Sequence, residues 1–399
     1  MSNHLTATDI LEVLFWTIVA LVFYTYVLFP LIISLLSKGK KLERQYFAPD
    51  DPDLPVISVL ISAFNEQEVI EAKILSVLNS GYPKDKFEIL VGSDGSTDNT
   101  NDIVESLTKK FQQLKFSPFE GRNGKGNIIN NLYNISKGSI IVFTDANVML
   151  EHSTLYELVK YFKDPHIGLV DTQMINTNLH THGISAQEKA YISREVIIKQ
   201  NEGILWGTMM GPFGGCYAIR KELYTPVPKN FLVDDFFVNM TILEKGYKCI
   251  NNIKARVFED VSNNLDDEFR RKVRIATGNF QNLRKFSNLL LSKTKGLSFC
   301  FISHKVLRWV VPFLLIISFF INFVLAMYLH LYSILFVLHV LLVLIPLVDF
   351  ILKKNGIHNS TLRLVTHFYA MNIALLIGFF KSLQKIESNV WKPTQRNQF

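Results

Sequence analysis

The sequence predicts an α/β domain that is built on a mainly parallel β-sheet and inserted between membrane-spanning helices. The 399 residues are 48% hydrophobic and only 19% charged, with 31 Phe, which is typical of chains with membrane segments. The apolar residues gather at the two ends of the chain. Between them, residues 53–292 alternate strand-like and helix-like segments, and this alternation favours parallel strands joined by right-handed crossovers.

The first apolar segment predicts a membrane-spanning helix within residues 1–37. From Ile10 to Leu36 the only charged residue is Glu12, and the run is longer than the roughly 20 residues that cross a bilayer. A basic linker follows at 38–52, whereas residues 1–9 hold no Lys or Arg. The positive-inside rule therefore places the N-terminus outside and the central domain in the cytoplasm.

The C-terminal apolar segments predict three further spans, at 306–329, 331–352 and 362–380. The first two form an expected hairpin, and the length of the third favours a span although it holds more polar residues. If the third crosses, the basic tail 381–399 lies outside, against the positive-inside rule; if it lies in the interface, the tail stays in the cytoplasm. The basic segment 293–305 is expected to lie in the interface as an amphipathic helix.

The elements of the central domain follow from their residue patterns. Short apolar runs rich in β-branched residues predict strands at 56–63, 87–92, 139–144 and 168–172. Apolar residues at helical spacing, or polar capping residues, predict helices at 68–78, 102–111 and 154–162. Thr154 and Glu157 are expected to form a capping box at the start of the last helix.

Charge and cysteine content exclude several classes of protein. The chain has 42 Lys and Arg against 35 Asp and Glu, a formal charge of +7, and the excess lies mostly beside the apolar segments. That placement suits membrane lipids better than nucleic acid, and no nucleic-acid partner is expected. The three Cys lack paired spacing, which excludes a disulfide framework or a zinc ribbon and fits a reducing compartment. We therefore expect a multi-pass protein of the inner, cytoplasmic membrane.

Polar side chains follow three predicted strands at the point where each strand ends. In parallel sheets, ligands bind beyond the carboxyl ends of the strands. We therefore expect one crevice to receive Asn65 and Glu66 after strand 56–63, Asp94 after strand 87–92, and Asp145 and Asn147 after strand 139–144. The dinucleotide fingerprint G-x-G-x-x-G and the P-loop are both missing from the sequence, so a nucleotide would be held by carboxylates, a metal ion and isolated basic residues.

Seven motifs lie between Pro55 and Gln281. They are ISAFNEQEVI (61–70), VGSDGSTDNT (91–100), GRNGKGNIIN (121–130), FTDANVML (143–150), GPFGGCYAIRKELY (211–224), VDDFFVNMTILEKGYK (233–248) and RRKVRIATG (270–278). Together and in this order they resemble the family 2 inverting glycosyltransferases, which have a GT-A fold. The layout of the chain resembles the membrane-integrated branch with cellulose, hyaluronan, chitin-oligosaccharide and poly-N-acetylglucosamine synthases.

The resemblance implies a UDP-sugar donor and a divalent metal ion, Mg²⁺ or Mn²⁺. Asp145 and Asn147 stand at the D-x-D position, which holds the metal on the donor diphosphate. Asn147 replaces the second Asp, which removes one charge but still offers an oxygen ligand. Asp94 matches the residue that hydrogen-bonds the nucleotide base. The expected donor-binding residues are therefore Asn65, Glu66, Asp94, Lys125, Asp145 and Arg274, of which Lys125 and Arg274 are the candidates to neutralise the diphosphate.

The resemblance also assigns the catalytic and acceptor residues. Asp235 matches the catalytic Asp of the T-E-D motif, and a carboxylate there can take the proton of the acceptor hydroxyl as general base. Arg274 matches the Arg of Q-x-x-R-W, but Arg271 and Ile275 stand where Gln and Trp are expected. Since that Trp commonly lines the acceptor's sugar, the acceptor and the processivity stay open. The expected acceptor-binding residues are Gly214, Gly215, Asp234 and Arg271.

Three functions are weighed on these residues. The first is a glycosyltransferase that extends a polysaccharide or a lipid-linked glycan, with export partners unknown. The second adds a single sugar to a lipid or glycan acceptor, and the third is a membrane receptor or transporter that only binds a nucleotide.

Two further features of the sequence each have two interpretations. His180 and His182 are metal ligands or, more simply, loop histidines. The glycine-rich segment 207–215 is a turn with positive φ or a backbone surface for the acceptor sugar.

Overall fold

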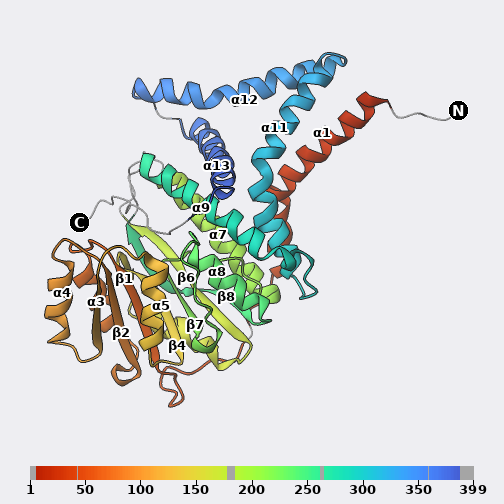
Figure 1. Ribbon diagram of the computed structural model, residues 1–399. Coiled ribbons are helices and arrows are strands. Elements are labelled where there is room, and N and C mark those ends of the chain that lie inside the picture. Colours follow the sequence, from red (N-terminus) through yellow and green to blue (C-terminus); the bar gives the residue numbers. More distant parts are fainter. Residues whose placement is uncertain (1–5, 43, 178–184, 261–264, 358, 387–399) are drawn as a thin grey trace.

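The computed structural model describes residues 6–386, apart from residues 43, 178–184, 261–264 and 358. Figure 1 shows a domain built around one sheet, with long helices extending away from one side of it. The N-terminal helix and the last helices of the chain both belong to this extension. The chain therefore begins in the region of the long helices, forms the central domain, and returns to the long helices at its end.

The central domain contains eight strands and seven α-helices of the described chain. The strands are β1 (Ile57–Ala63), β2 (Phe87–Asp94), β3 (Leu114–Phe119), β4 (Ile140–Asp145), β5 (Val148–Leu150), β6 (Ile167–Thr177), β7 (Cys216–Arg220) and β8 (Lys248–Asp260). The helices are α3 (Ile70–Leu78), α4 (Thr100–Thr108), α5 (Lys125–Ile135), α6 (Thr154–Val159), α7 (Ser185–Trp206), α8 (Asp234–Glu244) and α9 (Leu265–Lys285). The predicted strands correspond to β1, β2, β4 and β6, and the predicted helices to α3, α4 and α6.

The sheet is mainly parallel, which confirms the predicted fold class. Its strand order is β3-β2-β1-β4-β7-β6-β8-β5. β1 pairs in parallel with β2 and β4, as do β2 with β3 and β6 with β8. β7 is antiparallel to its neighbours β4 and β6, and β5 is antiparallel to β8. The parallel part places the ends of β1, β2 and β4 at one edge of the sheet.

Alternate residues of β1 are buried on the two faces of the sheet. Val59 and Ile61 pack with Ile74 of α3 in one hydrophobic core, whereas Leu60 packs with Ile128 of α5 in a second core. This is the two-residue period of a strand that is covered on both sides. Polar side chains can therefore gather only beyond the ends of such a strand.

The predicted capping box of α6 is wrong. The N-cap residue is Ser153, and its side chain makes no capping hydrogen bond. The hydroxyl of Thr154 donates instead to the carbonyl of Arg256 on β8 (2.5 Å), and the carboxylate of Glu157 pairs with Lys160 (2.6 Å). Glu157 also accepts a hydrogen bond from the side-chain N–H of Asn252 on β8 (2.8 Å), so neither side chain caps the start of α6.

Four helical segments of the described chain are long and apolar enough to cross a membrane. They are Ala7–Ser37, with α1 (Ala7–Phe23), a π-helical stretch (Tyr24–Leu28) and α2 (Phe29–Ser37); Leu297–Ala326, with α10 (Leu297–Cys300), a π-helical stretch (Phe301–Val306) and α11 (Leu307–Ala326); α12 (His330–Lys354); and α13 (Ser360–Ser382). Within the segment 293–305, the helix begins at Leu297 and runs without interruption into α11. An interfacial position for that segment stays a prediction.

The second hydrophobic core is shared between the domain and the long helices. It contains Phe29 and Ile33 of α2, Phe301 and Trp309 around the start of α11, and Phe236 of α8. Each of these side chains is at most 5% exposed. Residues from both apolar ends of the chain thus complete the face of the sheet that α8 covers.

Helix α13 packs along α9, as the side-by-side ribbons of Figure 1 show. A Cβ atom added at Gly378 of α13 would lie 2.4 Å from the Cβ of Ala276 on α9, so the two backbones approach closely. Phe379, the next residue of α13, packs edge to face against Phe280, which lies one turn after Ala276 on α9, with ring centroids 5.2 Å apart. The helix that carries Arg271 and Arg274 is therefore held by a helix able to cross the membrane.

Candidate active site

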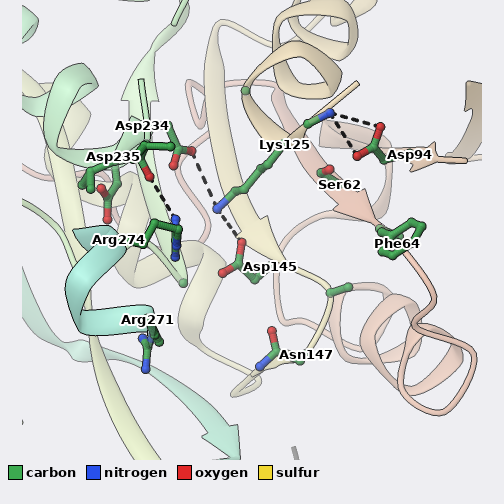
Figure 2. A pocket seen from close by; sticks show the side chains of 18 of the residues that line it. Ser62, Phe64, Asp94, Lys125, Asp145, Asn147, Asp234, Asp235, Arg271 and Arg274 are labelled. Atoms are coloured by element: carbon green, nitrogen blue, oxygen red, sulfur yellow. Dashed lines mark hydrogen bonds and ion pairs between the residues drawn. The ribbon is translucent and has the colours of Figure 1, made fainter. Parts of the chain in front are cut away.

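A cavity of about 230 Å³ lies at the carboxyl ends of β1, β2 and β4 (Figure 2). We call it the first cavity. Its walls come from the loops after these strands, the start of α5, the glycine-rich segment before β7, the start of α8, and α9. The structure brings all the predicted site residues together in it: Asn65, Glu66, Asp94, Lys125, Asp145, Asn147, Gly214, Gly215, Asp234, Asp235, Arg271 and Arg274.

Asp94 organises the loop that precedes α5. Its side chain, in a residue 3% exposed, accepts hydrogen bonds from the backbone N–H groups of Asn123 (2.5 Å) and Gly124 (3.1 Å). It also pairs with Arg122 (3.2 Å), whose guanidinium lies 3.4 Å from the ring centroid of Phe64. One buried carboxylate thereby fixes the backbone just before Lys125 and adds a flat cationic surface to the cavity wall.

Asn65 joins the loop after β1 to the loop after β2. Its φ of 53° is the one positive value among the described residues other than glycine, a conformation that Asn tolerates better than most residues. Its side-chain oxygen accepts a hydrogen bond from the N–H of Thr97 (2.8 Å). The N–H of Glu66 donates to the hydroxyl of Thr100 (2.9 Å). The two strand ends are thus held in register at the cavity mouth.

Lys125 lies between the carboxylates of two different elements. Its Nζ is 2.6 Å from Asp145 at the end of β4 and 3.7 Å from Asp234 at the start of α8, as the dashed lines of Figure 2 show. Burial alone would lower the pKa of Lys125, but the charges of Asp145 and Asp234 outweigh it and raise the pKa above its usual value. The ammonium group is therefore charged at neutral pH and bridges the two sides of the cavity.

Asp235 is a partly buried carboxylate with a raised pKa. Burial, and then the charge of Asp234, raise the pKa of Asp235 to about 7, although Lys125 acts in the opposite direction. One oxygen accepts a hydrogen bond from the N–H of Phe236 (2.6 Å). The other faces Gly214, where an added Cβ would lie only 2.3 Å away. A carboxyl group whose pKa lies near the operating pH is suited to general-base chemistry.

Asp145, Asn147 and Glu259 offer oxygen donors to a divalent cation. Asn147 is 8% exposed, and its side-chain N–H donates to Glu259 of β8 (3.3 Å). Among the described residues, no three His, Cys, Asp or Glu side chains are grouped tightly enough to hold a metal alone. Mg²⁺ commonly takes one or two carboxylates and completes its shell with substrate phosphates and water. The donor set fits such a shared site.

The two arginines of α9 have partners within the protein. Nη1 of Arg274 donates to the carbonyl of Leu232 (2.9 Å), and Nη1 of Arg271 lies 3.4 Å from Glu268. Burial, and then the charge of Arg271, lower the pKa of Arg274 from its usual value. The Leu232 contact fixes Arg274 beside the segment that leads to Asp234 and Asp235.

A second cavity, also of about 230 Å³, meets the first at Asp235. The residues that line both include Asp235, Phe213, Glu259, Arg271 and Ile275. The far wall of the second cavity comes from the beginning of α11 and the residues just before it: Lys305, Arg308 and Trp309. Asp235 thus stands between a polar cavity at the sheet edge and a cavity that reaches a helix able to cross the membrane.

Sequence reasoning did not single out Arg122, Glu259 or Trp309. Arg122 lies in a motif that signalled the site, GRNGKG, and only its Lys125 was chosen. Glu259 carries no local signal, because only the pairing of β8 with β5 and β6 brings it to the site. Trp309 lies in an apolar run that by itself indicates only a span. The two candidate ligands His180 and His182 lie outside the described residues.

Part of the central domain is similar to a known family of glycosyltransferases. Residues 58–225 match the family described as Glycosyl transferase family 2. The match covers most of the central domain, and it agrees with the seven motifs and with the edge of the sheet at which the site lies.

Curated relatives carry the names of glycosyltransferases. The probable glycosyltransferase YdaM of Bacillus subtilis is 26% identical over 248 residues, which are 59% of this chain and 57% of the relative. The poly-β-1,6-N-acetyl-D-glucosamine synthase of Staphylococcus aureus is 25% identical over 63% of this chain and 62% of its own. The β-monoglucosyldiacylglycerol synthase of Nostoc is 26% identical over 45% and 39%. The chain thus spans about two fifths to three fifths of these relatives.

A solved structure shares the fold of nearly the whole chain. It is the mannosyltransferase PcManGT of Pyrobaculum calidifontis, in complex with GDP-Man and Mn²⁺. It aligns with a TM-score of 0.71 at 21% identity and covers 94% of this chain and 99% of its own. The arrangement of the sheet together with the terminal helices is therefore found in a second protein.

Proposed function

We propose that the protein is a membrane-bound, inverting glycosyltransferase. It transfers a sugar from a nucleoside diphosphate sugar, expected to be a UDP-sugar, to a hydroxyl group of a glycan or lipid acceptor at the membrane. The observation that carries this proposal is the position of Asp235 where the first and second cavities meet. A base at that junction can contact an acceptor in one cavity while a donor occupies the other.

In the proposed reaction, the donor lies in the first cavity and the acceptor hydroxyl approaches from the second. The acceptor oxygen forms a bond to the anomeric carbon as the bond from that carbon to the diphosphate oxygen breaks. The proton of the hydroxyl passes to a carboxylate oxygen of Asp235, and the nucleoside diphosphate departs. The charges of Lys125 and Arg274 stabilise the departing diphosphate. Attack from the face opposite the leaving group inverts the anomeric configuration.

A divalent cation, Mg²⁺ or Mn²⁺, is part of the proposal. Asp145 and Asn147 would hold it, with Glu259 hydrogen-bonded to Asn147 beside them. Such a cation supplies charge stabilisation to the leaving diphosphate. The donor set of hard oxygens supports this assignment. PcManGT, the protein of similar fold, was solved with Mn²⁺.

The second cavity is the proposed site of the acceptor. It is walled by Lys305, Arg308 and Trp309 at the start of a helix able to cross the membrane, which favours an acceptor that is itself attached to the membrane. Ile275, at the family's Trp position, lines the same cavity, whose aromatic side chains are Phe213, Phe236 and Trp309. A growing chain and a single lipid-linked sugar both suit this arrangement, and the length of the radiolabelled product distinguishes them.

A donor screen tests the proposal. Purified full-length protein is incubated with UDP- and GDP-sugars, with Mg²⁺ or Mn²⁺ and membrane lipid extract, and release of the nucleoside diphosphate is measured. Release that depends on one sugar and on acceptor, and that is lost in Asp235→Asn, is expected. Binding of nucleotide without sugar-dependent release from any donor would instead identify a nucleotide-binding receptor or transporter. Preference for a GDP-sugar would change the expected nucleotide of the donor from UDP to GDP. The proposed reaction class would stay the same.

A further inference from the structure

A third cavity, of about 650 Å³, lies apart from the active site, and none of its lining residues belongs to the first or second cavity. Four stretches of chain form it. They are residues 39–42 and 44 after α2, residues 294–295 before α10, residues 204–208 at the end of α7, and residues 243 and 246–248 where α8 leads into β8. We call it the basic cavity.

The described residues that line the basic cavity include five basic side chains and no Asp or Glu: Lys40, Lys41, Arg44, Lys248 and Lys295. Arg44 has a distant ion pair, 3.8 Å from Asp164. The ion pairs found across the described chain include none to the four lysines. Like charges that face one cavity without anionic partners repel one another, and an anionic ligand would relieve that repulsion.

The basic cavity lies beside the ends of two membrane-spanning segments. The segment Ala7–Ser37 ends two residues before Gly39, and the segment Leu297–Ala326 begins two residues after Lys295. Both ends would sit at the level of the lipid headgroups. Lysines at this level are attracted to anionic lipid.

The wall of the basic cavity also contains an aromatic side chain suited to the interface. Trp206, at the end of α7, lines the cavity and packs edge to face against Phe299 of α10, with ring centroids 5.8 Å apart. Tryptophan is enriched at membrane–water interfaces, because its ring is apolar and its N–H is polar. If the phosphate of a lipid contacted the lysines, its glycerol region would lie beside the ring of Trp206.

We propose that the basic cavity binds the phosphate-bearing headgroup of an anionic membrane phospholipid. Phosphate matches the charge of the lysines, and the position beside two spans favours a phosphate attached to a lipid over a free one. The volume of about 650 Å³ leaves room for the glycerol backbone as well. The inference is independent of the reaction proposed for the active site.

Trp206 provides a fluorescence signal for a binding test on the detergent-solubilised full chain. The probes are short-chain phosphatidylglycerol, short-chain phosphatidylcholine and glycerol 3-phosphate. Phosphatidylglycerol is expected to bind at least about tenfold more tightly than the other two, with an affinity that falls as salt rises. The fluorescence change is expected to vanish in Trp206→Phe; its persistence would place the bound lipid elsewhere and overturn the proposal.

A charge-matched pair of variants tests the lysines. Lys41→Gln/Lys248→Gln/Lys295→Gln is expected to weaken phosphatidylglycerol binding by about tenfold or more. The control Lys109→Gln/Lys110→Gln/Lys137→Gln removes the same charge from exposed positions elsewhere on the domain and should bind like the parent.

Two results would overturn the proposal. One is equal affinity of the cavity variant and the control. The other is equal affinity for phosphatidylglycerol and phosphatidylcholine. Glycerol 3-phosphate binding as tightly as the lipid would overturn the lipid assignment and identify a site for a soluble phosphate ester instead.

Discussion

At the scale of single residues, the site depends on where charges are placed relative to Asp235. Burial raises the pKa of Asp235 most, Asp234 raises it further and Lys125 lowers it, so two neighbours that line the first cavity adjust the ionisation of the proposed base. Asp145, Lys125 and Asp234 form one chain of ion pairs across that cavity. A change at any one of them therefore alters the charge that the others experience.

The pH dependence of turnover should report Asp235. The proposed base acts when ionised, and its pKa is raised to about 7. Activity should therefore be full above that pH and fall about tenfold per pH unit below it. Because Asp234 raises the pKa, Asp234→Asn should keep activity and move the acidic limb to lower pH. The profiles of kcat/KM for parent and variant measure this, and an unmoved limb would contradict the role of Asp234.

The substitution Asp235→Asn should reduce turnover by about 10²–10⁴-fold while nucleotide-sugar binding persists, because the carboxylate is proposed to contact the acceptor. Equilibrium binding of donor and single-turnover rates separate the two effects. Loss of donor affinity at near-normal turnover would move Asp235 into the donor or metal site.

The proposed cation predicts a paired response at the D-x-D position. Asp145→Ala should abolish transfer, since it removes the charged ligand. Asn147→Asp should retain or raise activity, because it adds a carboxylate beside Asp145. Activity assayed in EDTA and after titration with Mg²⁺ or Mn²⁺ measures the requirement, and full activity in EDTA would refute the metal role.

The substitution Gly214→Ala should lower turnover by about 100-fold or more, because a Cβ there would displace the Asp235 carboxylate and misplacement of about 1 Å can cost that much. Gly246→Ala is the matched control. Its φ of 84° is close to the 83° of Gly214, but an added Cβ would meet nothing within 4 Å. Both variants carry the same backbone strain, so a difference in kcat isolates the contact with Asp235.

At the scale of secondary-structure elements, predictability depended on whether partners are local. Asp145 could be predicted because a buried apolar strand of adjacent residues ends there. Glu259 could not, since its place depends on the register of β8 against β5. The capping box of Thr154 failed for the same reason, because β8 supplied a competing acceptor. Periodicity in the sequence describes an element but not the neighbour against which the element packs.

The wall that α11 gives to the second cavity predicts a role for Trp309. Trp309→Phe should raise KM for the acceptor and leave KM for the donor unchanged, since Trp309 lines only the second of the two cavities. Phe is preferred to Ala because Trp309 is 4% exposed, and truncation of a buried Trp to Ala costs about 3–5 kcal/mol. Steady-state kinetics with each substrate varied in turn provide the measurement. Equal changes in both KM values would exclude a specific acceptor contact.

At the scale of the whole molecule, the proposed orientation places the central domain in the cytoplasm. The basic residues after the first span, beginning at Lys38, carry the prediction. Protease added to right-side-out vesicles should leave residues 53–292 intact, and inside-out vesicles should expose them. Cleavage within the domain in right-side-out vesicles would reverse the topology.

The shared core also constrains how the protein is made. Trp309 and Phe301 lie more than 60 residues beyond Phe236, against which they pack. During synthesis, α8 and the carboxylates at its start therefore lack these packing partners until the helix that contains Trp309 has been made. The second cavity of the candidate active site is complete only when that helix has been made and placed. A chain that ends before residue 309, or whose helix is not inserted, lacks this wall, so under the proposed function partial products are not expected to transfer sugar away from the membrane.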